Sequence, residues 1–581
     1  MTNPQNYREL TELEIVKLEG RGCVAEAWSR VKVSLDFEVE QLWAVRFEGD
    51  VVVGSRGQIF NSTVCNYRIG ADARVESVMR LECREASSFG NGVEVATINE
   101  NGGRGVKIYD TMRAQVAFVW ATRRERGAFV KALDALVERY AQSRMSPMGY
   151  IGERSQLIGA KFVREVWVEA DVRVEGATLL QNGTLRSGAY VGVGVKAKDF
   201  IAIEGSRIDT GATVERCLVG EGAIVANGFT AVDSLFWANS HLENGEAASI
   251  FAAPFTVSHH KSSLLIAGLF SFFNAGSGSN QSNHLFKCGA VHQAIHPRGC
   301  KFASGSYIMA PAAEGAFTMV KGYHAHHHDT QAFPFSYLIE ADGKSVLMPG
   351  ANLTSYGTER DIKKWQQRDK RSLKLDVVSL EESNPCITEM MIGAVNTIHT
   401  LQSENPTADV YMYNRVVLKP AHLKRGVGLY NKAIVAALGS ILSQGEGEPF
   451  DGGEVTLGGW IDCAGQYITS AAVERFIVSI ESGEISEVED LHTLFVEFHN
   501  SYNRYAYSWA LGLLGQLLGH EPTQEDIEGA IASGESSAAA LGKMRESDRA
   551  KDCSLDMAVG YGLNATDDEV KERDFRAVRG L

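Results

Sequence analysis

The chain has little proline and no long apolar run. Only 12 of its 581 residues are proline, which argues against a proline-rich linker or a disordered low-complexity tract. The longest apolar stretch, 264–273, is about half of the roughly 20 residues that a membrane-spanning helix needs. The first residues are polar and lack the basic and apolar regions of a signal peptide. We therefore expect a cytoplasmic protein with no membrane partner.

Paired cysteine motifs and an excess of positive charge are also missing. The 9 cysteines include no C-x-x-C spacing, so we expect reduced thiols in place of a disulfide framework. Lysine and arginine number 57 against 72 acidic residues, which gives a formal net charge of −15. Binding to nucleic acid requires a basic surface that neutralises phosphates. Nucleic acid is therefore not expected as a partner, whereas a small basic site for an anionic metabolite is compatible with this charge.

Glycine, in contrast, is abundant, with 58 residues, and it recurs in a short pattern. A glycine or acidic residue, a small residue and a β-branched residue follow one another in 69–75, 208–214 and 219–225. The aliphatic positions lie six residues apart, as Ile208 and Val214 do. A helix has a period of 3.6 and an ordinary strand a period of two. The six-residue period instead predicts a left-handed parallel β-helix, in which small residues form the corners between short flat faces.

The sequence predicts a β + α chain in which this left-handed parallel β-helix carries a helical insertion and precedes an all-helical C-terminal domain. The insertion is expected because Phe129, Leu133 and Leu136 share one helical face. The predicted parts are an N-terminal segment at 1–48, the β-helix at 49–355 with its insertion at 123–144, a charged connector at 356–385 and the helical domain at 386–581. Within the last domain we expect helices at 386–403, 420–443, 469–482, 488–518 and 523–548.

Several polar segments carry a family resemblance. They are 91–95, 108–110, 257–262, 274–278, 280–284 and 334–340. Together they resemble an uncharacterised bacterial family in which a hexapeptide-repeat β-helix precedes an all-helical domain. More distantly, the β-helix is similar to those of hexapeptide-repeat acyltransferases. That likeness implies a trimer with sites between subunits, a histidine general base and an acyl-coenzyme A donor. The chain lacks the nucleotidyltransferase signature of sugar-nucleotide pyrophosphorylases, which share such a β-helix.

Histidines gather where the repeat becomes irregular. Nine of the 15 histidines lie between residues 259 and 328, and residues one coil apart in a β-helix stack in space. Acyl transfer needs a base with a pKa near neutrality, which an imidazole supplies. Our first candidate is His284, because it follows an amide-rich turn and precedes Lys287. His259 and His260 come next, with a structural hydrogen-bonding role as the alternative for both.

The same window is rich in amides and cations, which favour an anionic ligand unless they are simply solvated. The residues expected to bind substrate are Asn280, Asn283, Lys261, Lys287, His292, Arg298, Ser306 and Tyr307. The connector carries six further cations: Arg360, Lys363, Lys364, Arg368, Lys370 and Arg371. These either clamp a pyrophosphate or form a solvated helix face.

A second cluster offers metal ligands. On an extended strand His324, His326 and His328 would share one face. With Asp329 they form a plausible set of zinc ligands. The alternative is a solvated surface patch that binds metal without function.

Three functions therefore stay open. The first is an acyltransferase-like enzyme of the hexapeptide-repeat type, acting with acyl-coenzyme A on a sugar, a sugar nucleotide or a related anionic metabolite. The second is a metal-dependent lyase or hydrolase that uses the histidine cluster with zinc. The third is a non-enzymatic scaffold that binds a small anionic metabolite. In each case we expect a homo-oligomer, with a trimer favoured by the resemblance.

Overall fold

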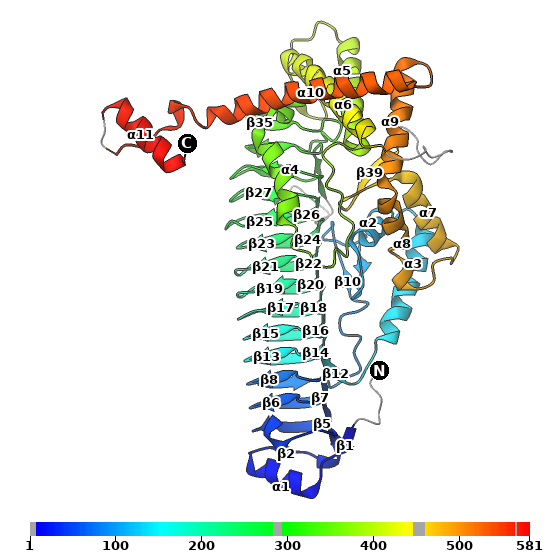
Figure 1. Ribbon diagram of the computed structural model, residues 1–581, viewed down its shortest axis with the longest axis vertical. Coiled ribbons are helices and arrows are strands. Elements are labelled where there is room, and N and C mark those ends of the chain that lie inside the picture. The colour runs from blue at the N-terminus through cyan, green and yellow to red at the C-terminus, as the bar shows by residue number, and fades with distance from the viewer. Residues whose placement is uncertain (1–6, 283–292, 446–458, 564–565, 581) are drawn as a thin grey trace.

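The computed structural model describes residues 7–282, 293–445, 459–563 and 566–580. Its main body is a parallel β-solenoid that rises as a stack of coils, with helices along one side and across the C-terminal end (Figure 1). The predicted order of a parallel β-solenoid followed by a helical region is confirmed. The strands of successive coils pair in parallel, so each coil covers the hydrogen-bonding edge of the one before it.

A typical coil contains one bent strand and one short strand. In β14, Phe162–Val168, the central residue Glu165 has a φ of 47°, and its neighbours on both sides pair with the next coil. The chain therefore turns a corner inside this strand, and β15, Arg173–Glu175, forms the third face. Val166 lies opposite Gly183 in the next coil, 17 residues later. The coil is thus one residue shorter than three hexapeptides.

The coils that matter for the site repeat this plan. The bent strands are β16 Leu179–Leu185, β18 Lys196–Ala202, β20 Thr213–Val219, β22 Thr230–Phe236, β24 Glu246–Ala252 and β26 Leu264–Phe270. The short strands are β21 Ile224–Ala226, β23 His241–Glu243, β25 Val257–Ser258, β27 Asn274–Ala275 and β30 Lys301–Phe302. Aliphatic side chains such as Val214 and Val225 point inward and are 1% and 0% exposed, so each coil adds a layer to one continuous core.

The solenoid begins earlier than predicted. Strand β3, Val31–Ser34, already pairs in parallel with β5, Arg46–Val53, so the boundary at residue 48 is wrong. Helix α1, Glu12–Gly20, lies at the open end of these first coils (Figure 1). The sequence pattern does not predict these first coils because they lack glycine-rich corners.

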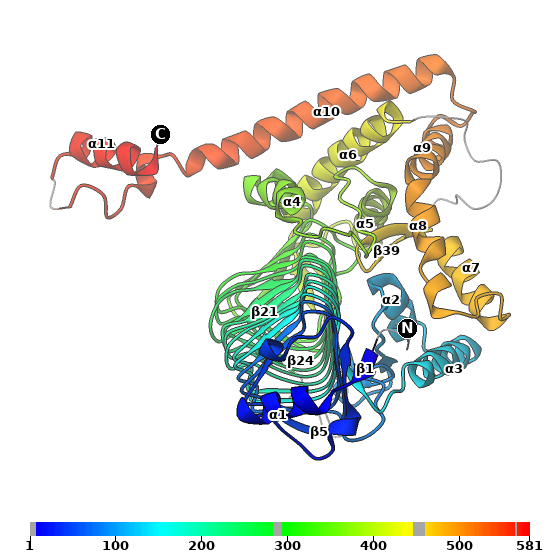
Figure 2. The ribbon, with the colours of Figure 1, turned by 60° about the horizontal axis from the view of Figure 1, so that its bottom comes forward.

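The helical insertion is larger than predicted. Helix α3, Gly127–Ser143, matches the expected amphipathic segment. Helix α2, Ala114–Thr122, precedes it, and seven of its nine residues are buried. A helix that is apolar on all sides shows no amphipathic period, which is why the sequence pattern missed α2. Both helices lie beside the solenoid (Figure 2). Helix α3 packs against α7, Ser470–Glu481, through Phe129 and Phe476, and α2 packs against strand β39, Trp460–Cys463. The coils resume at β12, Gly149–Ile151, as predicted.

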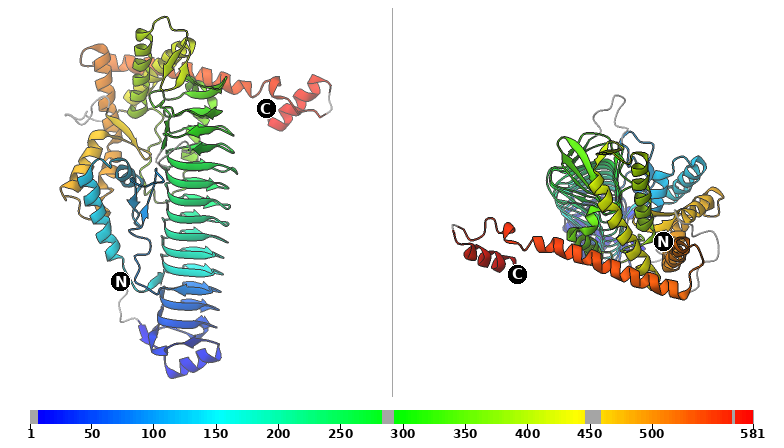
Figure 3. Two further views of the ribbon diagram at one scale, coloured as in Figure 1. Left: turned by 180° about the vertical axis from the view of Figure 1, so that it is seen from behind. Right: turned by 90° about the horizontal axis from the view of Figure 1, so that it is seen from above.

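The predicted C-terminal helices are largely confirmed. They are α5 Pro385–Glu404, α6 Pro420–Ser443, α7 Ser470–Glu481, α8 Thr493–Asn500, α9 Tyr502–Leu518 and α10 Gln524–Lys551. A further helix, α11 Asp568–Arg579, lies in a segment for which no helix is predicted. The helix expected at 488–518 is interrupted at Ser501, which separates α8 from α9. Figure 3 shows α10 crossing the end of the stack, while α11 stands away from it.

The C-terminal region is not all-helical. Its described residues include two β-hairpins, formed by β37 Tyr411–Tyr413 with β38 Val416–Leu418 and by β39 Trp460–Cys463 with β40 Gln466–Thr469. Strand β38 pairs with β36, Lys344–Met348, at the end of the solenoid. The first hairpin therefore covers part of the last coil. Helix α6 is long and apolar enough to cross a membrane by length and composition alone, and half of its most apolar window is buried inside the structure.

Candidate functional site

Helix α4, Tyr356–Arg368, lies beside the solenoid (Figure 1). Residues of both elements line a cleft. Its volume is about 560 Å³, which is within the range of small-molecule sites. We call it the α4 cleft. Its polar lining consists of Asn239, His241, His259, His260, Asn274, Lys301, Arg360, Asp361, Lys364, Arg368 and Lys370. The helix belongs to the segment that the sequence predicts as a charged connector.

Aromatic side chains at one corner of the coils support α4. Gly222 occupies this corner with a φ of 67°, and in the next coils Asn239, Phe255 and Phe272 take its place with φ of 56°, 58° and 46°. A bulky residue rarely adopts this left-handed conformation, which costs on the order of 1–2 kcal/mol. The rings of Phe255 and Phe272 stack with centroids 5.3 Å apart, and Trp365 of α4 packs 4.5 Å from Phe272. The ring packing offsets the strain and seats the helix.

The segment after α4 is fastened to the same corner. The side chain of Asn239 donates a hydrogen bond to Asp369 (2.9 Å) and accepts one from the Lys370 backbone N–H (2.9 Å). Arg371 forms a further ion pair with Asp369 at 2.8 Å. Glu221 accepts three backbone hydrogen bonds from residues 373–375. These contacts fix the backbone at Lys370, and so hold this residue at the corner of the coil, where it lines the cleft.

The cleft is positively charged. Five of its lining residues are cations and one is a carboxylate, Asp361. This carboxylate lies 3.1 Å from Lys301 and 2.8 Å from Arg360, and so neutralises part of their charge. Within the described part of the chain no ion pair is found for the other three cations, which are Lys364, Arg368 and Lys370. An acidic protein thus presents a local concentration of unneutralised positive charge, which favours an anionic ligand.

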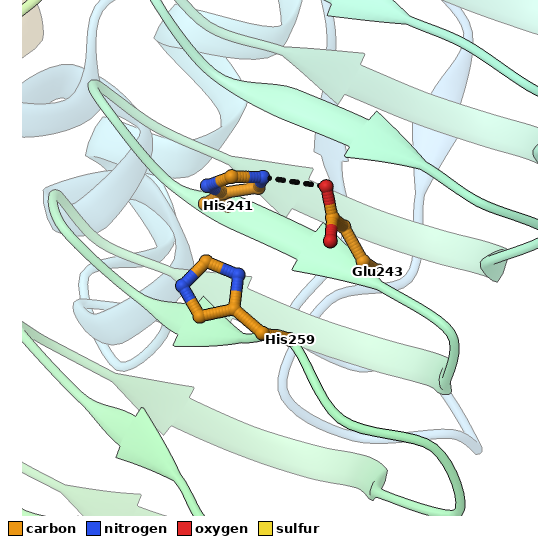
Figure 4. Close-up of side chains that lie close together, drawn as sticks. All are labelled: His241, Glu243 and His259. Carbon is orange, nitrogen blue, oxygen red and sulfur yellow. Dashed lines mark hydrogen bonds and ion pairs between the residues drawn. The ribbon is translucent and has the colours of Figure 1, made fainter.

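Two histidines that line the cleft, His241 and His259, lie close to the carboxylate of Glu243 (Figure 4). His241 and Glu243 share the outer face of β23, because residues two apart in a strand point the same way. Leu242 lies opposite Ser258 in the next coil, so His259 follows beside Glu243. His241 Nε2 is 2.9 Å from a Glu243 carboxylate oxygen, and the two imidazole centroids are 4.4 Å apart.

The environment of His259 favours its neutral form. Burial lowers the pKa of His259 below its ordinary 6.5, and the positive charges of His241, His260 and Arg368 add to this effect. Glu243 opposes the shift. Asn244 fixes the backbone here by donating from Nδ2 to the carbonyl of His259 at 3.1 Å. The backbone that carries the imidazole is therefore held in place, and the neutral form of the ring is favoured.

The structure brings only some of the predicted residues to this cleft. His259 and His260 line it, His260 at its exposed rim. Lys261 is exposed beside them and does not line it. Of the connector cations, Arg360, Lys364, Arg368 and Lys370 line it too. The predicted residues Asn283, His284, Lys287 and His292 lie outside the described residues.

Other predicted substrate-binding residues lie elsewhere. Arg298 is 2% exposed, and its guanidinium binds Asp462 at 2.6 Å and the carbonyls of Ser379 and Gly465. It ties the solenoid to the β39–β40 hairpin. The hydroxyl of Ser306 is buried and donates to a backbone carbonyl. Asn280 and Tyr307 belong to a separate three-stranded sheet, formed by β28 Asn280–Ser282, β31 Tyr307–Met309 and β34 Tyr323–His324.

The predicted zinc ligands do not converge. The segment is not one extended strand, because β34 ends at His324 and the chain bends at His326. His324 and His328 are buried inside the solenoid, whereas His326 and Asp329 are exposed. Among the described residues, the group of histidine, cysteine and acidic side chains close enough to share a metal ion is His241, Glu243 and His259.

The buried histidines instead belong to a polar chain inside the last coils. Gln281 Nε2 lies 2.8 Å from His296 Nε2, His296 Nδ1 lies 2.5 Å from Glu314, and the other Glu314 oxygen lies 2.8 Å from His328 Nε2. Burial raises the pKa of Glu314, but the two histidines outweigh it and lower the pKa to about 2. Next to this chain, burial and the charge of His328 lower the pKa of His324 to about 4.

Comparison with known proteins identifies the family. A family described as a domain of unknown function (DUF4954) matches residues 7–63 and 57–402, and one described as DUF6819 matches 452–581. An uncharacterized protein of Treponema pallidum (strain Nichols) is 23% identical over 434 residues, which cover 66% of this chain and 60% of the relative. This chain thus spans less than two thirds of that relative's length. Because the first match includes the solenoid, the α4 cleft and more than half of the chain, the protein belongs to the DUF4954 family.

Proposed function

We propose that the α4 cleft binds an anionic, phosphate-bearing metabolite and that the protein transfers an acyl group from acyl-coenzyme A to a hydroxyl of a sugar, a sugar nucleotide or a related acceptor. The observation that carries this proposal is the meeting of the His259–His260 pair with the cations of α4 in one cleft. The histidine pair supplies a proton acceptor and the α4 cations supply an anion site at the same place, although the two are about 100 residues apart in the sequence.

The charge of the cleft supports a phosphate-bearing ligand. Lys364, Arg368 and Lys370 approach it from one side, and the helix that carries the first two is seated on the solenoid by Trp365. Guanidinium groups match phosphate oxygens in a bidentate geometry, and ammonium groups act as point charges. The half-buried Trp365 ring adds an apolar surface on which a nucleotide base can stack.

The reaction requires a base but no oxidant. The acceptor oxygen forms a bond to the thioester carbonyl carbon, and the carbon–sulfur bond breaks. A cleft histidine takes the hydroxyl proton and returns it to the departing thiolate. His259 and His260 are the candidates, since both line the cleft.

The solenoid supports the same class of enzyme by analogy. We propose that it is a left-handed β-helix related to hexapeptide-repeat acyltransferases, although its typical coil has 17 residues. In those enzymes neighbouring subunits of a trimer form the active site. Here α4 supplies a second wall from the same chain. Because folds host unrelated reactions, the cleft carries more weight than this likeness.

Turnover tests the proposal. The full-length protein is incubated with acetyl-coenzyme A and a panel of hydroxyl-bearing sugar nucleotides, and release of the free thiol is followed. We expect acceptor-dependent release that falls by about 100-fold or more in a His259→Ala/His260→Ala double variant. His326→Ala, which changes an exposed histidine outside the cleft, should keep the wild-type rate. Tight binding without turnover across the panel would instead identify a metabolite-binding scaffold, and would overturn the transferase.

A further inference from the structure

We infer that His241, Glu243 and His259 form a binding site for a divalent transition-metal ion, with zinc as the best match, in the wall of the α4 cleft. The inference deepens the proposed function and rests on it only for the role of the ion towards a ligand. The metal site itself rests on the three side chains alone.

The geometry provides three ligand atoms in one place. One nitrogen of each histidine and one carboxylate oxygen of Glu243 all lie within 4.8 Å of one another. Ligands at roughly 2.0–2.2 Å around a tetrahedral zinc ion stand a little over 3 Å apart, so small side-chain rotations suffice to close the site. Figure 4 shows the two rings and the carboxylate turned toward a common point.

The chemistry of the three groups is that of a catalytic zinc site. Two imidazoles and one carboxylate leave a fourth tetrahedral position open for water or substrate, whereas structural zinc sites are usually closed by four protein ligands. All three residues are half-buried, and the two histidines line the 560 Å³ cleft that a ligand can enter. The open position therefore points to where the proposed anionic metabolite binds.

The positive charge around the metal site determines which kind of group occupies the fourth coordination position. Arg368 is near enough to act on His259, and its charge opposes a bare cation. Glu243 supplies one negative charge in compensation, and an anionic oxygen of the ligand in the fourth position supplies another. The ion would then anchor the ligand from the solenoid side while the α4 cations hold it from the other. With His259 on the ion, His260 remains as the cleft histidine that can accept a proton.

Titration with Co²⁺, a spectroscopic substitute for zinc, tests the site. Metal-free full-length protein should bind one Co²⁺ per chain, with the intense visible absorption of a tetrahedral site. His241→Ala and His259→Ala should each weaken binding by more than about tenfold. His260→Ala, one residue away, should leave the affinity unchanged. Glu243→Gln, nearly identical in shape, should also weaken binding, and so covers the case that a histidine variant fails to fold.

Two results would overturn the site: no stoichiometric Co²⁺ binding by the wild type, or equal Co²⁺ affinity in the wild type and in the His241, Glu243 and His259 variants. Failure of the proposed function is separate, since acetyl-coenzyme A binding is measured with metal-free protein. If acetyl-coenzyme A binds the metal-free protein but Co²⁺ does not bind at the three residues, only the metal inference falls. If Co²⁺ binds as expected and no acyl-coenzyme A or sugar nucleotide does, the proposed function falls and the metal site stands.

Discussion

Asn239 holds Lys370 at the edge of the α4 cleft: its side-chain oxygen accepts the Lys370 backbone N–H at 2.9 Å. The same amide donates to Asp369 at 2.9 Å. We predict that Asn239→Gly loosens this segment and weakens binding of phosphate-bearing ligands several-fold. Glycine tolerates the φ of 56° at this corner, so the effect reports the lost hydrogen bonds and not backbone strain. Calorimetric titration with coenzyme A measures it.

The control for that variant is a corner asparagine whose side chain does not contact the segment after α4. Asn244→Gly removes an asparagine with a similar φ of 58° and a hydrogen bond to His259, but leaves the α4 segment untouched. It should preserve the attachment of residues 369–376, seen as unchanged amide hydrogen exchange there. Equal exchange in Asn239→Gly and the wild type would show that Asn239 does not fasten the segment.

Trp365 should hold α4 against the solenoid. Its ring packs on Phe272 at 4.5 Å and on Phe317 at 6.1 Å. Trp365→Ala removes this packing, and loss of a large aromatic side chain from a packed site costs up to about 3–5 kcal/mol. Because the ring is only half-buried, we expect a local effect. Amide exchange in α4 should accelerate, while exchange in β22 and β24 stays as in the wild type. Gln366→Ala, on the exposed side of α4, is the matched control.

Glu314 should be essential for the stability of the last coils. It is fully buried and binds His296 and His328 with its two carboxylate oxygens. Glu314→Ala leaves both imidazoles unpaired in the core, and breaking a buried pair in this way costs about 3–5 kcal/mol. Glu314→Gln keeps one acceptor oxygen and should therefore lower the free energy of unfolding by less than Glu314→Ala does. Urea denaturation compares them with Glu535→Ala, an exposed carboxylate on α10. A wild-type midpoint for Glu314→Ala would contradict the account.

His324 should make the fold sensitive to mild acid. The pKa of His324 in the folded protein is about 4, below the ordinary 6.5, so the unfolded chain takes up the proton first. The contribution of His324 to the free energy of unfolding is therefore complete above about pH 6.5. As the pH drops toward 4, the free energy of unfolding falls by up to roughly 3 kcal/mol. His324→Gln should lose less stability between pH 7 and pH 4.5 than the wild type. His326→Gln, an exposed neighbour, should follow the wild-type curve.

Much of the fold could be predicted from the sequence because periodicity is a local property. The six-residue spacing of Ile208 and Val214 indicated the solenoid, and both side chains are buried in it. The helix expected at 420–443 matches α6 residue for residue. The break at Ser501 was missed, since the aromatic stripe from Phe495 to Trp509 continues across it as one buried seam.

The site was only half predictable. The sequence singled out His259 and the connector cation Lys364 separately, yet nothing in either pattern shows that α4 lies on the coil that carries His259. The position of α4 depends on aromatic residues at the corners of the coils, where the sequence pattern normally has glycine. His241 and Glu243 were missed because they precede the histidine-rich window. The coil from β23 to β25 has 16 residues, one fewer than the typical 17, and it is this shorter coil that places His259 beside Glu243.

The most direct test of the central claim is the affinity of the protein for coenzyme A in two matched variants of α4. Lys364 lines the cleft, whereas its neighbour Lys363 points away and pairs with Glu359. The claim that the α4 cleft is the anion site predicts that Lys364→Ala weakens binding by about fivefold or more, as expected for a lost charge-assisted hydrogen bond. Lys363→Ala should bind as the wild type does. Equal affinities for both variants and the wild type, or no measurable binding by any of them, would contradict the claim.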